Sequence, residues 1–428
     1  MIVNKRENRK ELYLNFNQKD YMKTWFELVK KMEAEGFTWS SLLENEEWNQ
    51  YMSPSLYTMS NSRWQEIMEA STRITQILQK TWFIIRSDRK LFYKLKLPLS
   101  TWDAVLSEPL NKMFSYFVRY DLVVTENQIK MIEANVDTPT GIMEPSVANR
   151  VITEAHFASH PNTIEEKLIK TWKQIVKDYG MRPEDKIFFT SYAWHEEDCQ
   201  TAHFILKHCL NHPTEFVDIE EIIISKDGLF TPQGEKINYL YRLYPLEYLD
   251  EDVDAMGKQI GHMFLNHIAS GNVKIINPPS AFMMQSKALL GVIWELYEME
   301  SVYYSQEERE WIKSYFLPTY FSSDYFKANG IPYVAKPLWG REGGGVSIIQ
   351  GDKIEEDRTE YYYNQPKIFQ EYIEMPDQSI GTWDGVFHGK LLFGSHIIGG
   401  ETAGLFLRVG ERITGNLSMF MGITKETN

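Results

Sequence analysis

The chain has 428 residues, of which 43% are hydrophobic and 24% charged, so it is long enough for two or three soluble domains or one large α/β body. Its formal net charge of -14 argues against non-specific nucleic-acid binding, which needs a basic surface. An acidic surface fits a cationic small substrate, and it still allows a local basic pocket for an anionic ligand.

Two cysteines, Cys199 and Cys209, are too few for a disulfide scaffold and suit a reducing compartment, so we expect a cytoplasmic protein. Residues 1–20 are charged and mixed, without an apolar core of signal-peptide length. No stretch offers the roughly 20 consecutive apolar residues that a membrane helix needs. We therefore expect neither a membrane nor a nucleic acid as partner.

Residues 1–115 are predicted to be mainly helical. Apolar side chains recur at helical spacing from Tyr21 to Glu35, and Gly36 follows as a terminator. A second helix is predicted from Ser60 to about Lys80. Its core-facing positions are Ile67, Ile74, Ile77 and Leu78. The segment between Pro98 and Pro109 is predicted to be irregular.

Residues 119–140 predict two short strands joined by a polar turn. Glu133 and Asn135 are two apart on the return strand, so both side chains project from one face. An antiparallel partner strand can bring Asp121 close to that face. Two carboxylates and an amide oxygen are the hard donors that hold Mg²⁺ together with phosphates. The alternative is a solvated hairpin with ordinary surface acids.

Residues 151–250 predict a small embedded α/β domain. A helix over 163–179, with Asn162 or Thr163 as its N-cap, precedes a buried strand over 185–190. A helix over 196–210 then leads through 216–220 to a second strand over 221–225. Strand, helix and strand at this spacing indicate a parallel crossover. A strand over 237–244 and helices over 256–268 and 286–297 follow.

The segments from residue 333 onward are predicted to form an antiparallel sheet. They are 333–337, 346–350, 367–373, 379–387, 390–396 and 405–408. Between the first two, Gly343, Gly344 and Gly345 let backbone N–H groups approach an anion. Lys336 and Arg341 add cationic donors, so this turn predicts a phosphate-covering loop that is not a Walker loop. The alternative is a structural hairpin with a flexible tip.

Two further strand ends carry polar side chains. After the strand that ends in Gln370 and Glu371, backbone groups can pair with an adenine edge while the acid reaches the ribose, although such strand ends are common. Arg408 can stabilise negative charge on a transferred phosphoryl or acyl group. The alternative for a lone arginine is a surface salt bridge.

The helix predicted over 196–210 begins with a dense acidic patch at residues 196–198. These acids either cap and stabilise the start of the helix, where its dipole is positive, or hold an amine. His195, Cys199 and His203 recur at steps of four and share one face, which allows a transition-metal site. Such stripes are more often packing or surface. No Ser-His-Asp or Cys-His pattern has a recognisable local signature, and no nucleophile elbow is present.

Taken together, these motifs resemble the glutathionylspermidine synthase family, in the form that lacks the N-terminal amidase domain. The resemblance runs from about residue 10 to the C-terminus. It rests on Arg119–Asp121, Glu133–Thr140, Tyr244–Glu247, Lys287–Leu290, Lys336–Gly343, Gln370–Glu371, Arg408 and Thr414–Asn416. It implies an α+β or α/β chain with a permuted ATP-grasp-like fold, an antiparallel C-terminal sheet and an embedded preATP-grasp-like domain.

The resemblance also implies a domain order. Residues 1–115 would be the helical part of the synthetase body, and 116–150 a hairpin for metal and acyl substrate. Residues 151–250 would be the embedded substrate domain, and 251–428 would hold the lysine strands, the glycine-rich lid and the C-terminal sheet.

The resemblance assigns roles to individual residues. The implied ligands of two Mg²⁺ ions are Asp121, Glu133 and Asn135. The implied ATP contacts are Lys287, Lys336, Gly343, Gly344, Gln370, Glu371, Tyr372 and Ile373. The implied stabilisers of the transferred phosphoryl are Arg119 and Arg341. The implied contacts to the peptide and amine substrates are Asp137, Thr138, Thr140, Glu196, Glu197 and Arg408.

The implied activity is ATP-dependent joining of a peptide carboxylate, such as that of glutathione, to a polyamine through an acyl phosphate. One alternative is an ATP-grasp ligase with a different peptide and amine. Another is an ATP-binding protein without ligase activity. The sequence does not fix the oligomeric state, and a homodimer is one arrangement it allows.

Overall fold

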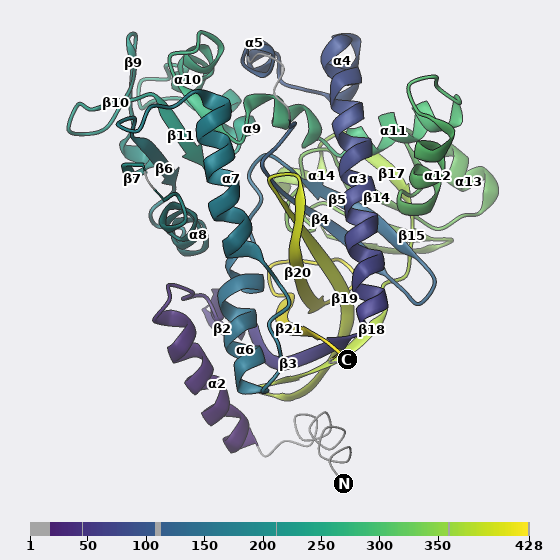
Figure 1. Cartoon of the computed structure of the whole chain (residues 1–428). Coiled ribbons are helices and arrows are strands. Elements are labelled where there is room, and N and C mark those ends of the chain that lie inside the picture. The colour runs from purple at the N-terminus through teal and green to yellow at the C-terminus, as the bar shows by residue number, and fades with distance from the viewer. Residues whose placement is uncertain (1–17, 45, 108–112, 211, 358–359, 427–428) are drawn as a thin grey trace.

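The computed structural model describes residues 18–44, 46–107, 113–210, 212–357 and 360–426, and its central element is a seven-stranded sheet (Figure 1). In spatial order its strands are β3 (Met52–Met59), β21 (Met419–Lys425), β20 (Glu401–Gly410), β19 (Gly385–Ile398), β4 (Phe117–Val124) and β5 (Ile129–Asn135), with β18 (Asp377–Thr382) paired to β19. Neighbours are antiparallel except β3 and β21, which run parallel.

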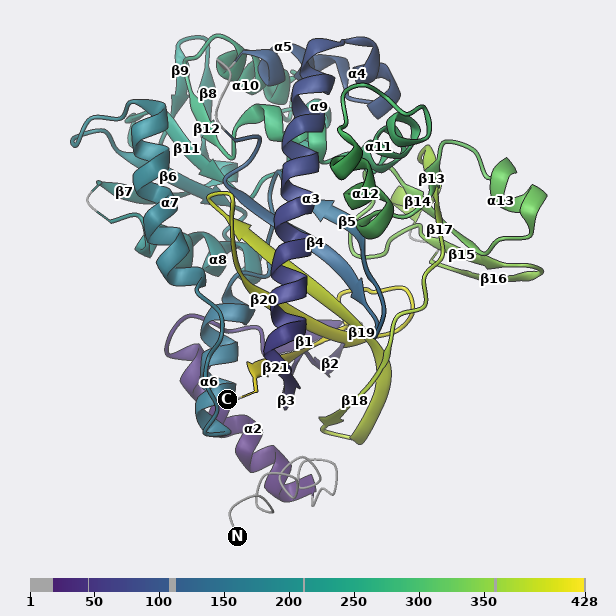
Figure 2. The ribbon, with the colours of Figure 1, turned by 45° about the vertical axis from the view of Figure 1, so that its right-hand side comes forward.

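One face of this sheet is covered by the long helix α3 (Asn61–Ser87), which lies across the strands in both ribbon views (Figures 1 and 2). The Ser60 side chain caps it by accepting from the Arg63 N–H, as Ser, Thr, Asp and Asn do at helix starts. The predicted core positions are fully buried, and the helix continues past Lys80. The hydroxyls of Ser71 and Ser395 lie 2.7 Å apart across this interface.

A second, four-stranded parallel sheet has the order β12 (Lys274–Ile276), β11 (Tyr239–Arg242), β6 (Ile187–Ser191), β7 (Thr214–Asp218). Helix α8 (Glu196–Lys207) makes the predicted crossover from β6, but its parallel partner strand is 214–218, not 221–225. Residues 223–225 instead form β8 in a small sheet with β9 (Gly228–Phe230) and β10 (Lys236–Ile237). The predicted strand over 237–244 is therefore divided between two sheets.

The strands predicted after residue 333 belong to two sheets, and the expectation of a single sheet is wrong. A five-stranded sheet contains β13 (Thr319–Tyr320), β17 (Lys367–Glu371), β14 (Tyr333–Pro337), β15 (Ser347–Gln350) and β16 (Lys353–Glu356). The later strands β18 to β20 join the central sheet. The predicted strand over 379–387 is broken where Gly385, with φ +116°, ends the turn between β18 and β19.

The N-terminal part contains more strand than expected. Helix α2 (Gln18–Glu33) forms as predicted, but β1 (Ser41–Glu44), β2 (Glu47–Gln50) and β3 follow it. Strand β3 carries Pro54 and several hydroxyl residues, so it has no regular alternation that would have marked it as a strand. Its parallel pairing with β21 joins the beginning of the chain to its end (Figure 2).

The remaining helices flank the sheets. They are α4 (Lys90–Leu95), α5 (Trp102–Leu106), α6 (Asn149–Ala155), α7 (Ile164–Tyr179), α9 (Leu246–Glu251), α10 (Ile260–Ala269), α11 (Ala288–Glu298), α12 (Gln306–Tyr315), α13 (Asp324–Asn329) and α14 (Glu360–Tyr363). Helix α7 begins after Thr163 as predicted, but no side-chain bond caps it, and Asn162 instead bonds both backbone groups of Leu405. Within the described ranges, no helix combines the length and apolarity needed to cross a membrane.

Candidate active site

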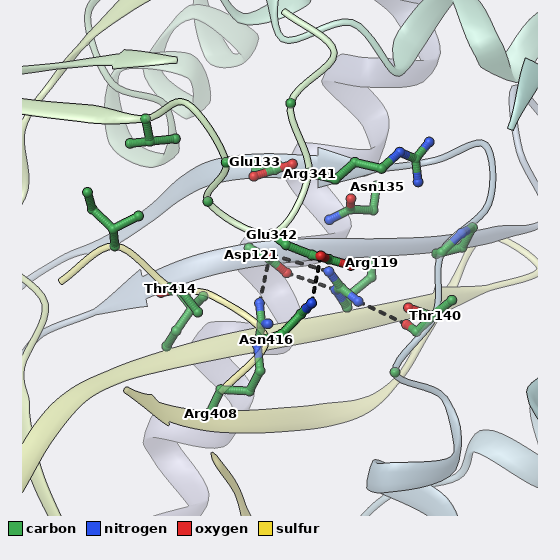
Figure 3. A pocket seen from close by; sticks show the side chains of 18 of the residues that line it. Arg119, Asp121, Glu133, Asn135, Thr140, Arg341, Glu342, Arg408, Thr414 and Asn416 are labelled. Atoms are coloured by element: carbon green, nitrogen blue, oxygen red, sulfur yellow. Dashed lines mark hydrogen bonds and ion pairs between the residues drawn. The ribbon is translucent and has the colours of Figure 1, made fainter. Parts of the chain in front are cut away.

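A cavity of about 570 Å³ is bordered by the face of the central sheet opposite α3 and by the five-stranded sheet. Every residue to which the family resemblance assigns a role lines this cavity, except Asp137, whereas Cys199 and His203 of the histidine stripe do not line it. The residues come from strands and loops up to about 290 positions apart, between Arg119 and Arg408 (Figure 3). The fold therefore brings the separate sequence motifs into one place.

The predicted hairpin forms and supplies the acidic side chains. Asp121 on β4 is directly opposite Glu133 on β5, and Arg119 is opposite Asn135. Alternation along β4 sends Arg119 and Asp121 to the cavity, while Tyr120 faces α3. The pairing register shifts after Asp121, which marks a bulge at this position.

The Asp121 carboxylate is buried between two arginines. Arg119 Nε donates to Asp121 Oδ1 at 2.9 Å, and Arg119 Nη1 donates to the Thr140 carbonyl at 3.0 Å. Arg408 Nη2 approaches Asp121 Oδ2 at 3.5 Å from β20 (Figure 3). The two predicted cations of the phosphoryl and acyl sites thus already share one carboxylate.

Two lysines lie on the neighbouring side of the cavity. Lys287 Nζ is 2.8 Å from Glu133 Oε1. Lys336 Nζ donates to the Ile132 carbonyl at 2.9 Å and to Gln370 Oε1 at 2.8 Å. Burial lowers the pKa of Lys336 to about 8, and although Glu133 acts against this effect, Lys287 adds to it.

The glycine-rich turn forms a loop over the cavity. Glu342, Gly343 and Gly345 have φ values of +55°, +74° and +70°, a conformation that glycine adopts at no steric cost. The turn is held from two sides, because Asn416 Nδ2 donates to Glu342 Oε2 at 2.7 Å and Arg341 Nη2 to Glu247 Oε1 at 2.5 Å.

The strand end proposed as an adenine hinge lines the other end of the cavity. The backbone N–H groups of Glu371 and Tyr372 already donate to the carbonyls of Pro318 and Pro332, at 2.8 and 3.0 Å. Among the described residues, the Ile373 N–H has no hydrogen-bond partner in the backbone. The main-chain donor open to a base edge is therefore that of Ile373.

An acidic and aromatic region lies at the cavity end that Glu196 and Glu197 line. Behind it Glu144 is fully buried, accepting from Tyr51 Oη at 2.8 Å and Trp39 Nε1 at 3.1 Å. Burial, and next the nearby Glu144 carboxylate, raises the pKa of Glu197 to about 8. The raised pKa favours the protonated, uncharged form of the Glu197 carboxyl, and a cationic group bound beside it would favour the ionised form.

Asp137 has a different environment from the one predicted. Its carboxylate is buried and makes two bonds to Arg242 of β11, at 2.6 and 3.0 Å, instead of facing the cavity. Asn277 Nδ2 also donates to the Asp137 carbonyl at 3.0 Å. Asp137 thus ties the segment before Thr138 and Thr140 to the parallel sheet, while those two threonines line the cavity.

The histidine stripe on α8 makes local contacts. His195 Nδ1 accepts from the Asp198 N–H at 3.3 Å as the helix N-cap, and His203 Nδ1 lies 2.8 Å from the Cys199 carbonyl. Across the described parts of the chain, no three His, Cys, Asp or Glu side chains are grouped to hold a metal.

Several cavity residues were missed by the sequence analysis. They include Trp39, Tyr51, Glu342 and Arg412, and the buried Glu144 lies behind the wall. Glu342 could have been found, because it follows Arg341 on a turn already identified. The others lie in segments without a motif, and only the fold brings them to the cavity.

Three comparisons with known proteins bear on this site. The family model described as glutathionylspermidine synthase preATP-grasp matches residues 21–424. A candidate acid–amine ligase from Haemophilus influenzae is 26% identical over 321 residues, covering 71% of this chain and 72% of that protein. A glutathione synthetase-like effector from Globodera pallida, solved without ligand, superposes with a TM-score of 0.59 at 10% identity, over 96% of this chain and 99% of that one, which shows a shared fold.

Proposed function

The chain belongs to the glutathionylspermidine synthase preATP-grasp family, and on that basis we propose that it is an ATP-dependent ligase that joins a carboxylate to an amine through an acyl phosphate. The main support is that two lysines, several arginines and a cluster of oxygen donors line one cavity beneath a glycine-rich loop. Phosphoryl transfer from ATP needs this combination, because its catalysis consists of positioning and charge stabilisation.

ATP would lie with its base at residues 370–373 and its phosphates toward Lys287 and Lys336. Both lysines line the cavity, and each is already paired with protein oxygens that the phosphates would replace or share. Gly343 and Gly344 would close over the phosphates, since their lack of side chains lets the backbone approach.

Asp121, Glu133 and Asn135 would hold two Mg²⁺ ions together with the phosphates. The donor set fits, because carboxylate and amide oxygens are the ligands that Mg²⁺ takes. Among the described residues, Asn135 Nδ2 is buried without a hydrogen-bond partner, so no protein contact fixes the direction of this amide. When bound, the ions would neutralise phosphate charge during transfer.

The acyl substrate would be held by Thr138, Thr140 and Arg408, beside the Arg119–Asp121 pair. Arg408 offers a planar guanidinium suited to a carboxylate. The amine would enter past Glu196 and Glu197, where the acidic region favours a cation. We propose glutathione or a similar peptide as the acid, and a polyamine as the amine.

The reaction then needs no protein nucleophile. The substrate carboxylate attacks the γ-phosphoryl group of ATP, and ADP leaves. The amine attacks the acyl carbon, the C–N bond forms and phosphate leaves with one oxygen from the carboxylate. Arg119 and Arg341 would stabilise the transferred phosphoryl, and the loop would exclude water while the acyl phosphate exists.

The experiment is a panel of peptides and amines incubated with ATP and Mg²⁺, with ADP release followed and the products identified by mass spectrometry. The proposal expects ADP release that requires both an acid and an amine, with a product mass equal to their sum minus water. Tight ATP binding without turnover on any pair would favour a non-catalytic ATP-binding protein instead.

A further inference from the structure

The side-chain partner of Arg341 is Glu247, near the start of α9. Arg341 Nη2 lies 2.5 Å from Glu247 Oε1, and the guanidinium carbon lies 5.8 Å from the centre of the Tyr248 ring. Figure 3 shows Arg341 apart from the Arg119–Asp121–Arg408 group, without an interaction joining it to them. Arg341 is therefore held by α9 and not by the Asp121 carboxylate that Arg119 and Arg408 share.

The two partners come from different kinds of segment, because Arg341 lies at a turn and Glu247 in a helix. Arg341 begins a turn in which Glu342 and Gly343 have positive φ values, and its carbonyl accepts from the Gly344 N–H at 2.8 Å. Among the described residues, no side chain of this turn pairs with the Arg341 guanidinium. Glu247 lies between Leu246 and Leu249, which are both buried in the core. The helix, anchored by these two leucines, thus supplies the carboxylate with which the Arg341 side chain pairs.

The contact leaves bonding capacity on both sides. Within the described residues, Glu247 Oε2 and Arg341 Nε are buried and have no hydrogen-bond partner. A two-bond pair would use both oxygens and leave fewer guanidinium N–H groups for other anions. Since the contact here is a single bond, Arg341 keeps N–H donors for a second anion in the cavity that it lines.

We propose that Glu247 is a positioning residue for Arg341: it orients the guanidinium in the cavity wall before the phosphoryl group is transferred. This inference rests on the proposed ligase function. Glu247 touches no reacting atom. It lowers the cost of ordering Arg341, so its effect belongs to the rate of the chemical step more than to ATP binding.

The first test compares Glu247→Gln with Glu251→Gln. Glu251 lies on the same helix, is exposed and contacts Tyr361 Oη at 3.3 Å, so it makes a matched control outside the cavity. Glu247→Gln should lower kcat about tenfold with KM for ATP little changed, because orientation is lost and not binding. Unchanged kcat, a loss confined to KM, or faster amine-independent ADP release would overturn the proposal.

A double-mutant cycle then asks whether Glu247 acts through Arg341. With Arg341→Ala present, adding Glu247→Gln should lower kcat by less than twofold, because the residue to be positioned is already gone. Effects that multiply independently would show that Glu247 acts by another route and would overturn the proposal.

A readout that needs no substrate separates this inference from the function on which it rests. Hydrogen exchange of the peptide spanning 338–346 should be faster in ligand-free Glu247→Gln than in Glu251→Gln. Equal exchange would overturn the positioning role even if the ligase reaction is found. If exchange is faster in Glu247→Gln but no ligase turnover is found, Glu247 still positions the loop. That result would count only against the proposed function.

Discussion

The buried charges of the cavity neutralise one another. Asp121 lies between Arg119 and Arg408, and Glu133 is paired with Lys287. Isolated charges away from water are costly, and pairing with an opposite charge offsets part of that cost. Binding of ATP with its Mg²⁺ ions must replace these ion pairs with contacts to phosphate and metal. Because Glu133 would bind the metal and its partner Lys287 the phosphates, binding of one is linked to binding of the other.

Replacement of Glu133 tests this link. Glu133→Gln keeps the shape of the side chain but removes the charge that pairs with Lys287 and would face Mg²⁺. Because changes in the shell around metal ligands already cost about 10–100-fold, replacing a charged ligand by a neutral amide should lower turnover at least ~100-fold. A Mg²⁺ titration of ADP release measures this, and an unchanged titration would remove Glu133 from the metal site.

Replacement of Asp137 should affect stability and not substrate binding. Asp137→Asn breaks the buried pair with Arg242, and such breaks cost about 3–5 kcal/mol because the partner remains charged. Urea unfolding should show this loss, while the protein that remains folded should keep its KM for the acyl substrate. A raised KM without a loss of stability would instead support the predicted role of Asp137 in substrate binding.

At the scale of elements, the glycine-rich loop depends on close contact with the segment before β21. A Cβ added to Gly343 would lie 2.8 Å from Ile413 Cγ2 and 2.9 Å from the Thr414 carbonyl oxygen. Gly351 also has a positive φ, of +62°, but has nothing within 4 Å. An alanine at either position would therefore strain the backbone, but only an alanine at position 343 would also crowd residues 413–414.

This pair gives a prediction for the loop. Gly343→Ala and Gly351→Ala should each lose about 1–2 kcal/mol of stability, the usual cost of a left-handed alanine. Only Gly343→Ala should also lose turnover, because its Cβ pushes the loop away from residues 413–414. Equal turnover in the two variants would show that the loop does not need this contact.

Individual helices and strands could be predicted from the local sequence pattern, but the segments with which they pair could not. The core positions of α3 and the 119–140 hairpin were predictable, since periodicity and turn residues act within a few positions. The pairing of β3 with β21, the division of the C-terminal strands between two sheets and the Asp137–Arg242 pair depend on segments far apart in sequence. No local signal carries such pairings.

The same division holds for the cavity. Its residues beside glycines or on alternating strands, such as Arg341 and Glu133, could be selected from sequence. Tyr51 and Glu144 could not, because Tyr51 is an ordinary aromatic residue and Glu144 looks exposed until the fold buries it. The domain boundaries drawn at residues 115, 150 and 250 remain proposals.

At the scale of the whole molecule, one buried histidine should make stability depend on pH. Burial, and next the nearby Arg119 cation, lowers the pKa of His396 to about 3. This is below the ordinary value near 6.5, so its contribution to stability is complete above about pH 6.5 and is lost as pH falls toward 3.

The variant His396→Leu should flatten the stability profile between pH 6.5 and 4, by at most about 1.4 kcal/mol per pH unit for one proton. His388→Leu is the control, because His388 is exposed on the same strand. Urea unfolding at a series of pH values measures the slopes. A slope as steep in His396→Leu as in the unchanged protein would contradict the assignment.

The central claim is that a substrate carboxylate becomes an acyl phosphate in this cavity. The most direct measurement uses an acid substrate in which both carboxylate oxygens are ¹⁸O, with ATP and the amine, and analyses the released phosphate by mass spectrometry. The mechanism predicts one ¹⁸O in each phosphate, because the carboxylate oxygen that attacks ATP leaves with it. Phosphate without ¹⁸O, formed while the amide product accumulates, would contradict the acyl phosphate route.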